Sequence, residues 1–143
     1  MKIKKAFTLL EMLVVVGIIA ILVSMGIASY STAQRKARDA KRRSDMSSIR
    51  NAYEQYYSLC SFRYPTALPA SGAKLTATTA DCPQLSANVE ILTMPADPLG
   101  YQYVCEGCTT STFLICPSTS VGGGQRLETE SCNDQSCCLA NQQ

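Results

Sequence analysis

The sequence predicts an α+β protein in which one long N-terminal α-helix packs on a small antiparallel β-sheet. The helix is predicted by an apolar run over residues 7–30 and by a following stretch, residues 31–59, that contains neither proline nor glycine. The sheet is predicted by short runs of β-branched and aromatic residues after Pro65. A chain of 143 residues has room for this helix and for one small globular domain, which we expect over residues 60–143.

The N-terminal segment begins with a short basic leader and then becomes apolar, with Glu11 as its one charged residue up to Tyr30. A run of this length can cross a bilayer core of about 30 Å. An ionised carboxylate at the centre of a membrane helix is unfavourable by roughly 2.5–3.5 kcal/mol, so Glu11 requires a partner. Cleavage between Ala6 and Phe7 would expose an α-amino group that could pair with Glu11 of a neighbouring subunit. We therefore predict an assembly role for Glu11.

The basic leader, the small residue Ala6 and the run Phe-Thr-Leu-Leu-Glu over residues 7–11 resemble the processing motif of type IV pilins and of the pseudopilins of type II secretion systems. The resemblance implies that a membrane peptidase removes residues 1–6 on the cytoplasmic side and methylates the new amine of Phe7. It also implies that mature chains stack through residues 7–30 into a filament of this subunit and related pilins, without a cofactor. A glycine usually precedes the cut in that family, where this chain has Ala6.

All eight cysteines follow the apolar run, which favours an oxidising compartment for residues 60–143. We therefore predict a cytoplasmic N-terminus and a periplasmic or extracellular C-terminal domain, carried on a cell-surface filament after assembly. Disulfides, each typically worth about 2–4 kcal/mol, would compensate for a thin core. We expect Cys60 to pair with Cys82, and the C-terminal cysteines to reach back to the predicted hairpin. The disulfide candidates are Cys60, Cys82, Cys105, Cys108, Cys116, Cys132, Cys137 and Cys138.

Zinc is the main alternative for these cysteines. Cys105 and Cys108 have the spacing of one half of a zinc ribbon, and Cys132 with Cys137 or Cys138 could supply the other half. A thioredoxin-like redox role for Cys105 and Cys108 is weaker, because the pair does not begin a helix in a βαβ unit. We predict no metal site, and we assign no calcium ligands to residues 128–134.

Residues 31–59 are predicted to form the amphipathic half of the helix. An apolar stripe on this half should pack on the C-terminal domain, and it comprises Ile49, Ala52, Tyr53, Tyr56 and Tyr57. The run rich in arginine and lysine over residues 35–43 is expected to be solvated and to contact lipid headgroups where the helix leaves the membrane. Binding of nucleic acid by this run is the alternative.

In the C-terminal domain, residues 66–88 are predicted to be a loop, and the next structured stretch should begin near residues 89–92. Residues 101–105 and 112–116 alternate and carry aromatic or β-branched side chains, which predicts an antiparallel hairpin. A third short strand is expected over residues 126–129.

Two functions from other classes remain open. Residues 1–28 could be an ordinary secretory signal that releases a soluble disulfide-rich binding module, although its apolar region would be unusually long and would contain a Glu. The second alternative function is that of an oxidoreductase that uses Cys105 and Cys108. The chain has no histidine, the commonest general base and metal ligand, which weighs against an enzyme. We predict a structural subunit that polymerises, with no catalytic residues.

Overall fold

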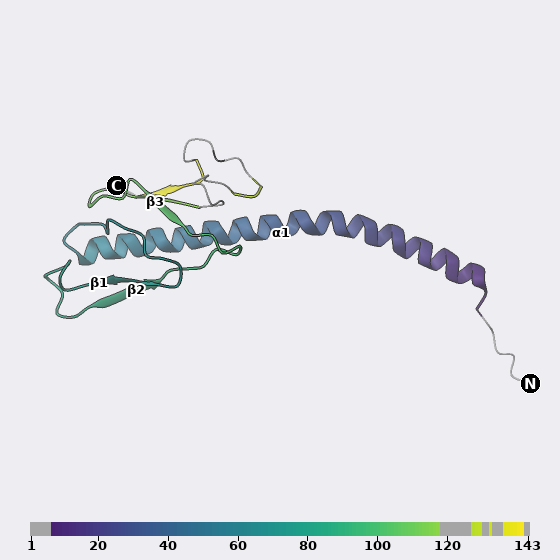
Figure 1. Cartoon of the computed structure of the whole chain (residues 1–143), viewed down its shortest axis with the longest axis horizontal. Coiled ribbons are helices and arrows are strands. Elements are labelled where there is room, and N and C mark those ends of the chain that lie inside the picture. The colour runs from purple at the N-terminus through teal and green to yellow at the C-terminus, as the bar shows by residue number, and fades with distance from the viewer. Residues whose placement is uncertain (1–6, 118–126, 130–131, 133–135, 142–143) are drawn as a thin grey trace, which may run out of the picture. The chain divides into compact units, whose positions relative to one another are not determined.

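The computed structural model describes residues 7–117, 127–129, 132 and 136–141. The chain divides into two compact units between Lys36 and Ala37. The elements, in chain order, are α1 (Leu9–Leu59), β1 (Lys74–Ala77), β2 (Val89–Thr93), β3 (Val104–Glu106), β4 (Leu114–Cys116) and β5 (Leu139–Ala140) (Figure 1). The predicted α+β class, with one long N-terminal helix and small antiparallel sheets, is confirmed.

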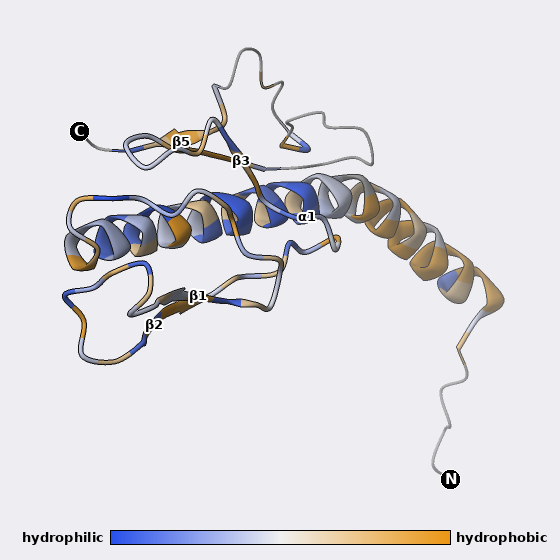
Figure 2. Ribbon diagram, turned by 60° about the vertical axis from the view of Figure 1, so that its left-hand side comes forward, coloured by the Kyte–Doolittle hydropathy of each residue, from blue (hydrophilic) through white to orange (hydrophobic). Residues whose placement is uncertain are grey.

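The first unit contains the N-terminal part of α1, whose ribbon is hydrophobic over most of residues 9–27 (Figure 2). The large apolar residues from Leu9 to Tyr30 are between 48% and 82% exposed. The helix contains a stretch long and apolar enough to cross a membrane, and none of that stretch is buried within the chain. In water, so much exposed apolar surface is unfavourable by roughly 25 cal/mol per Å². This unit therefore requires a bilayer or other protein chains around it.

The second unit has its core between the C-terminal part of α1 and the strands. The predicted stripe on the helix lies in this core: Ile49, Ala52, Tyr53 and Tyr56 are buried, and Tyr57 is partly buried against them. Aromatic rings contribute much of the packing. Phe113 contacts Tyr53 and Tyr64 at ring-centroid distances of 4.9 Å and 4.8 Å, and Tyr57 stacks on Tyr64 at 4.4 Å. The stripe is thus core rather than a binding surface.

Within the described residues the strands form two small sheets instead of one, with orders β1-β2 and β3-β4-β5. The predicted antiparallel hairpin is present: Val104 lies opposite Cys116, and Glu106 lies opposite Leu114. A third strand joins it, because β5 pairs antiparallel with β4, with Leu139 opposite Ile115. The hairpin strands are shorter than the predicted ranges of residues 101–105 and 112–116.

Two strand predictions are wrong. The predicted loop over residues 66–88 contains β1, which pairs with β2 and buries Leu75 and Ala77. With one large apolar side chain among Thr, Ala and Lys, this strand gave little periodic signal. The strand expected over residues 126–129 is also absent, since residues 127–129 are irregular and Arg126 lies outside the described residues. Leu127 is nonetheless buried, so the apolar signal came from packing without strand pairing.

All eight cysteines are paired in four disulfides: Cys60–Cys82, Cys105–Cys108, Cys116–Cys138 and Cys132–Cys137. The predicted Cys60–Cys82 pair is present, and Cys138 reaches back to β4 as expected. The expectation that Cys132 and Cys137 also reach the hairpin is wrong, because they pair with each other. The zinc alternative is contradicted as well, since no thiol remains free to become a thiolate ligand.

Candidate functional site

The N-terminus of α1 is closed by a reciprocal pair of side chains, Thr8 and Glu11. The Thr8 backbone N–H and hydroxyl donate to Glu11 Oε2 at 2.9 Å and 2.8 Å, and the Glu11 backbone N–H donates to Thr8 Oγ1 at 3.2 Å. This is a capping box, in which the N-cap hydroxyl and the acid three residues later satisfy N–H groups that lack helical partners. The carboxylate also lies at the positive end of the helix dipole.

The Thr-x-x-Glu spacing was a sequence signal for this cap, and the sequence analysis missed it by assigning Glu11 to assembly alone. The cap supplies the carboxylate with hydrogen bonds inside its own chain. Both bonds fall on Oε2, and within the described residues Oε1 accepts no hydrogen bond. Glu11 therefore has a local partner in a single chain and still has an oxygen available to a cation.

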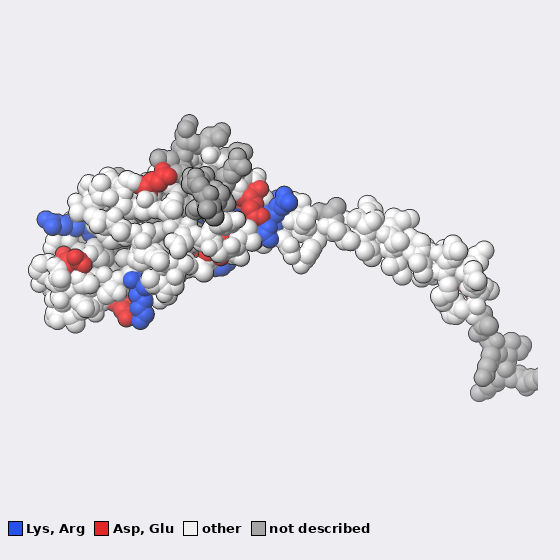
Figure 3. All heavy atoms as spheres, viewed as in Figure 1, with Lys and Arg blue, Asp and Glu red and all other residues white. Residues whose placement is uncertain are grey.

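The other residues of the predicted processing site are placed only in part. Phe7 precedes the helix and is 74% exposed. Ala6, on the other side of the predicted cut, lies outside the described residues. From Phe7 to Tyr30 the sequence has Glu11 as its one charged residue, and the face of this part of the helix in Figure 3 is white, without Lys or Arg. A helix that is apolar on all sides is typical of a membrane span or of the centre of a helix bundle.

Comparison with known proteins gives matches that include this N-terminal segment. Residues 1–27 match a family model described as the prokaryotic N-terminal methylation motif. The chain is also 35% identical over 105 residues to the type II secretion system core protein G of Escherichia coli (strain K12), a match that covers 71% of this chain and 70% of that protein. The chain belongs to the pilin and pseudopilin family. No solved structure gives a significant match.

Proteins of the pilin and pseudopilin family are structural subunits and not enzymes. The apolar helix of this chain and its methylation motif fit a membrane-anchored protein of a surface filament. The match to core protein G extends well beyond the motif, because it covers 71% of the chain. The resemblance therefore includes much of the C-terminal unit and is not limited to the processed N-terminus.

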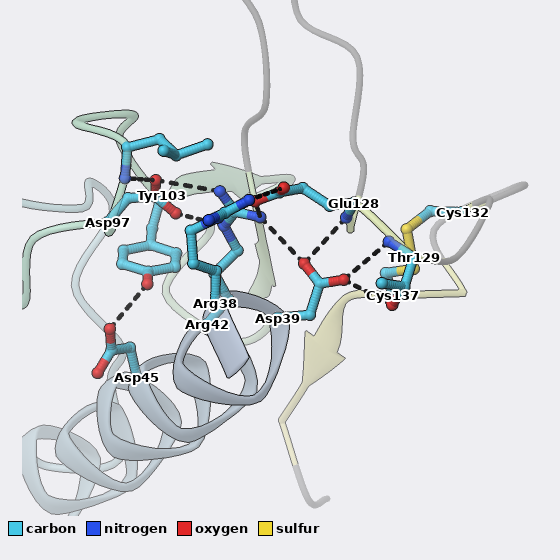
Figure 4. Close-up of polar contacts among 11 residues, drawn as sticks. Arg38, Asp39, Arg42, Asp45, Asp97, Tyr103, Glu128, Thr129, Cys132 and Cys137 are labelled. Carbon is cyan, nitrogen blue, oxygen red and sulfur yellow. Dashed lines mark hydrogen bonds and ion pairs between the residues drawn. A yellow bond between two sulfur atoms is a disulfide. The ribbon is translucent and has the colours of Figure 1, made fainter. Parts of the chain in front are cut away.

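A second polar cluster lies in the C-terminal unit of this pilin, around the buried side chain of Arg42 (Figure 4). Its guanidinium donates to Asp97 Oδ2 at 2.5 Å, to Asp39 Oδ1 at 3.0 Å and to Glu128 Oε1 at 3.2 Å. Arg38 adds two bonds to Glu128, at 2.7 Å and 2.5 Å. These contacts correct the prediction of a solvated run at Arg38 and Arg42. The other basic residues of the run are exposed as predicted, and their contact with lipid headgroups stays a prediction; they are Arg35, Lys36, Lys41 and Arg43.

Asp39 fastens the segment at residues 128–129 to α1. Its carboxylate accepts from the backbone N–H of Glu128 at 2.9 Å, and from the backbone N–H and hydroxyl of Thr129 at 2.8 Å and 2.6 Å. Burial alone would raise the pKa of Asp39, but the bonds from Thr129, Glu128 and Arg42 outweigh it, so the pKa lies below its usual value. The hydrogen bond from Arg38 likewise lowers the pKa of Glu128, against a smaller effect of burial.

Asp97 has two roles, and its Asp-Pro-Leu-Gly context predicted only one of them, the turn. Its carboxylate accepts the backbone N–H of Leu99 at 2.8 Å, and its carbonyl accepts that of Gly100 at 2.9 Å, which forms the predicted turn. Gly100 has φ +80°, a conformation that favours glycine. The same carboxylate holds Arg42 and raises the pKa of that guanidinium. The acids of this cluster thus bind arginines and backbone N–H groups, and they act as internal anchors.

The signal for this cluster was present in the sequence. Asp39, Arg42, Asp45 and Ile49 are spaced by three or four residues, so the stripe that carries the tyrosines continues through the basic run. Asp45 shares this face, where it accepts from the hydroxyl of Tyr103 at 2.9 Å and from Lys41 at 3.1 Å. The prediction considered only the charge of the run, so it missed that Asp39 and Arg42 face the core.

Proposed function

We propose that this chain is a filament-forming subunit of a type II secretion pseudopilus, assembled from copies of itself and related pilins through the N-terminal part of α1. The observation that carries the proposal is the helix of residues 9–30, whose apolar side chains are exposed on all sides. The similarity to core protein G favours a secretion pseudopilus over a pilus for adhesion or DNA uptake.

The physical drive for assembly comes from covering this helix. Fully burying a Val, Leu or Ile side chain contributes roughly 1.5–3 kcal/mol, and the segment offers many of them. A bilayer covers them before assembly, with the N-terminus in the cytoplasm and residues 60–143 in the periplasm or outside the cell. When the subunit leaves the bilayer, the same helices of neighbouring copies provide the replacement apolar surface.

Glu11 sets the register between neighbours in this proposal. A prepilin peptidase cuts between Ala6 and Phe7 and methylates the new amine of Phe7, which stays cationic. That cation approaches Glu11 of an adjacent subunit, because an unpaired charge in an apolar bundle is strongly unfavourable. The bonds from Thr8 hold the carboxylate in place until the amine arrives. Binding of nucleic acid has little support, since Arg38 and Arg42 are used inside the domain.

Two variants separate the assembly role of Glu11 from its capping role. Glu11→Ala removes both, whereas Thr8→Val removes the hydroxyl of the cap and leaves the carboxylate. We expect Glu11→Ala to insert in the membrane but to form few or no filaments, and Thr8→Val to form filaments at a moderately reduced level. Sheared filaments, quantified against the membrane-bound pool by immunoblotting, measure this. If Glu11→Ala forms filaments at the wild-type level, the proposed pairing of Glu11 with the amine of Phe7 is wrong.

Intact-mass analysis of the purified protein tests processing. A chain that begins with N-methylated Phe7 is expected. A chain that begins at Ser29 would instead support an ordinary signal peptide and a released disulfide-rich binding module. Filaments whose subunits retain residues 1–6 would contradict the pairing of Glu11 with the amine of Phe7.

A further inference from the structure

A cavity of about 470 Å³ lies in the C-terminal unit between α1 and the segment that carries β5. Its volume is in the range of pockets that hold small molecules. One wall is the helix face with Arg43, Met46, Ser47 and Arg50, which are spaced by one and two helical turns. The opposite wall includes Leu127 and the residues from Ser136 to Leu139.

The second wall is fixed covalently. Cys137 and Cys138 both line the cavity, and each forms a disulfide, with Cys132 and with Cys116 of β4 respectively. Leu139 follows them and pairs with Ile115 in the sheet. A wall held by two disulfides and a strand pairing loses little conformational freedom when a ligand binds, which favours affinity.

Arg50 gives this cavity its chemical character. Its Nε is buried and, within the part of the chain that the structure describes, is the one buried side-chain nitrogen or oxygen without a hydrogen-bond partner. Buried N–H groups are almost always bonded, so the unbonded Nε shows that the described part of the chain leaves hydrogen-bonding capacity of the Arg50 guanidinium unused. With no hydrogen bond holding it among the described residues, the guanidinium can turn its donors toward a ligand.

The remaining lining residues define what that acceptor is attached to. Among the described residues that line the cavity none is acidic, and Arg43 contributes a second guanidinium. The apolar part of the lining consists of Leu139, which is partly exposed, and of Met46 and Leu127, which are almost fully buried. A guanidinium binds a carboxylate through two parallel hydrogen bonds, and the apolar surface suits a hydrocarbon chain.

We propose that this cavity is a binding site for a carboxylate that carries an apolar chain, with Arg50 as the residue that binds the anion. The site is separate from the N-terminal assembly segment and does not depend on the proposed filament function. Such a group could belong to a free short-chain fatty acid or to the C-terminal residue of a peptide. Both present the same chemistry, a carboxylate next to aliphatic carbon.

The test is an NMR titration of the full-length chain in a non-ionic detergent, with ¹³C-labelled methionine methyl groups as reporters. Met46 lines the cavity, Met94 is buried elsewhere in the same unit, and Met25 lies in the exposed apolar helix. Hexanoate is the first probe and N-acetyl-leucine the second, which represents a peptide terminus. Hexan-1-ol and acetate are the controls for the missing charge and the missing chain.

We expect hexanoate or N-acetyl-leucine to shift the Met46 methyl signal saturably while Met94 and Met25 stay unchanged. The probe with the higher affinity identifies the source of the ligand. Arg50→Gln should weaken binding about tenfold or more, because a hydrogen bond to a charged group is lost. The matched control Arg63→Gln, at an exposed arginine that does not line this cavity, should bind as the wild type does.

Three results would overturn the proposal. The first is the absence of a saturable shift at Met46 with either carboxylate, which would mean that the cavity holds only water. The second is equal affinity for hexanoate and hexan-1-ol, which would mean that no charge is recognised. The third is unchanged affinity in Arg50→Gln, which would exclude the residue as the anion-binding group.

Discussion

The two units of this protein differ in where their charged side chains find partners. In the N-terminal unit, Glu11 is exposed on an apolar helix and has only the neighbouring Thr8 as a partner within the described residues. In the C-terminal unit, Arg42 is completely buried and bonded to three carboxylates. The first unit therefore depends on surroundings outside its own chain, whereas the second satisfies the buried charge of Arg42 internally. The buried charges of the second unit serve its stability, whereas for Glu11 of the first unit we propose a role in assembly.

Removing Arg42 should have the largest effect on the C-terminal unit. Arg42→Ala leaves Asp39, Asp97 and Glu128 without their shared cation, and breaking a buried ion pair in this way typically costs about 3–5 kcal/mol of the free energy of unfolding. Denaturant unfolding of the full chain in detergent, followed by tyrosine fluorescence, measures it.

The matched control is Arg35→Ala, at an exposed arginine of the same basic run on the N-terminal side of the division between the units. We expect a change of within about 0.5 kcal/mol there. Equal losses in the free energy of unfolding for Arg35→Ala and Arg42→Ala would contradict the proposed difference between the two units in how charged side chains contribute to stability.

Removing a disulfide should have the next largest effect on the free energy of unfolding, and the size of that effect should depend on the length of the loop that the disulfide closes. Cys60 and Cys82 are separated by 22 residues in sequence, whereas Cys105 and Cys108 are separated by 3. Loop-closure entropy then predicts a loss of about 3 kcal/mol for replacing the first pair with alanine and about 2 kcal/mol for the second. Denaturant unfolding of the two double variants compares them. A larger loss for the Cys105–Cys108 pair would show that native contacts, and not the unfolded chain, decide the effect.

Acid should weaken the C-terminal unit through Asp39 and Glu128. Both pKa values are lower in the folded chain than the ordinary values of 3.8 and 4.5, so their contribution is complete above those values and is lost as the pH falls through the folded pKa values. The melting temperature should therefore decrease below about pH 4.5. In Asp39→Asn the decrease should be smaller, while Glu90→Gln, at an exposed strand residue, should retain the wild-type decrease. An identical pH profile in Asp39→Asn would exclude Asp39 as a source of the acid sensitivity.

The smallest effect is expected at the surface pair of Lys74 and Glu90, which joins β1 to β2 at 2.7 Å. Both side chains are more than half exposed, at 54% and 62%. Exposed pairs contribute at most about 1 kcal/mol and are screened by salt. Lys74→Ala should lower the free energy of unfolding by less than that, and the difference should shrink further in high salt. A loss comparable to that of Arg42→Ala would mean that burial is not what separates strong from weak ion pairs here.

Much of the fold could be predicted from local patterns. The apolar run over residues 7–30, the tyrosine stripe and the hairpin all depend on neighbours a few positions apart, and each was located without tertiary information. β1 and β5 were missed because their short runs carry little periodic signal. Of the candidate site, Phe7 and Glu11 followed from the leader and the apolar run, but the cap formed with Thr8 was overlooked.

The sequence by itself determined that the chain has a long apolar helix with one acid near its start, followed by a cysteine-rich domain. Helical and strand periodicity is a local property, so it can be found along the chain. Only the tertiary structure decided that Arg42 is buried, since its partners Asp97 and Glu128 lie 55 and 86 positions away. The same holds for the choice among cysteine pairings and for the cavity beside Arg50. Each depends on which distant segments meet, and folding brings these together to bury the apolar stripe of α1.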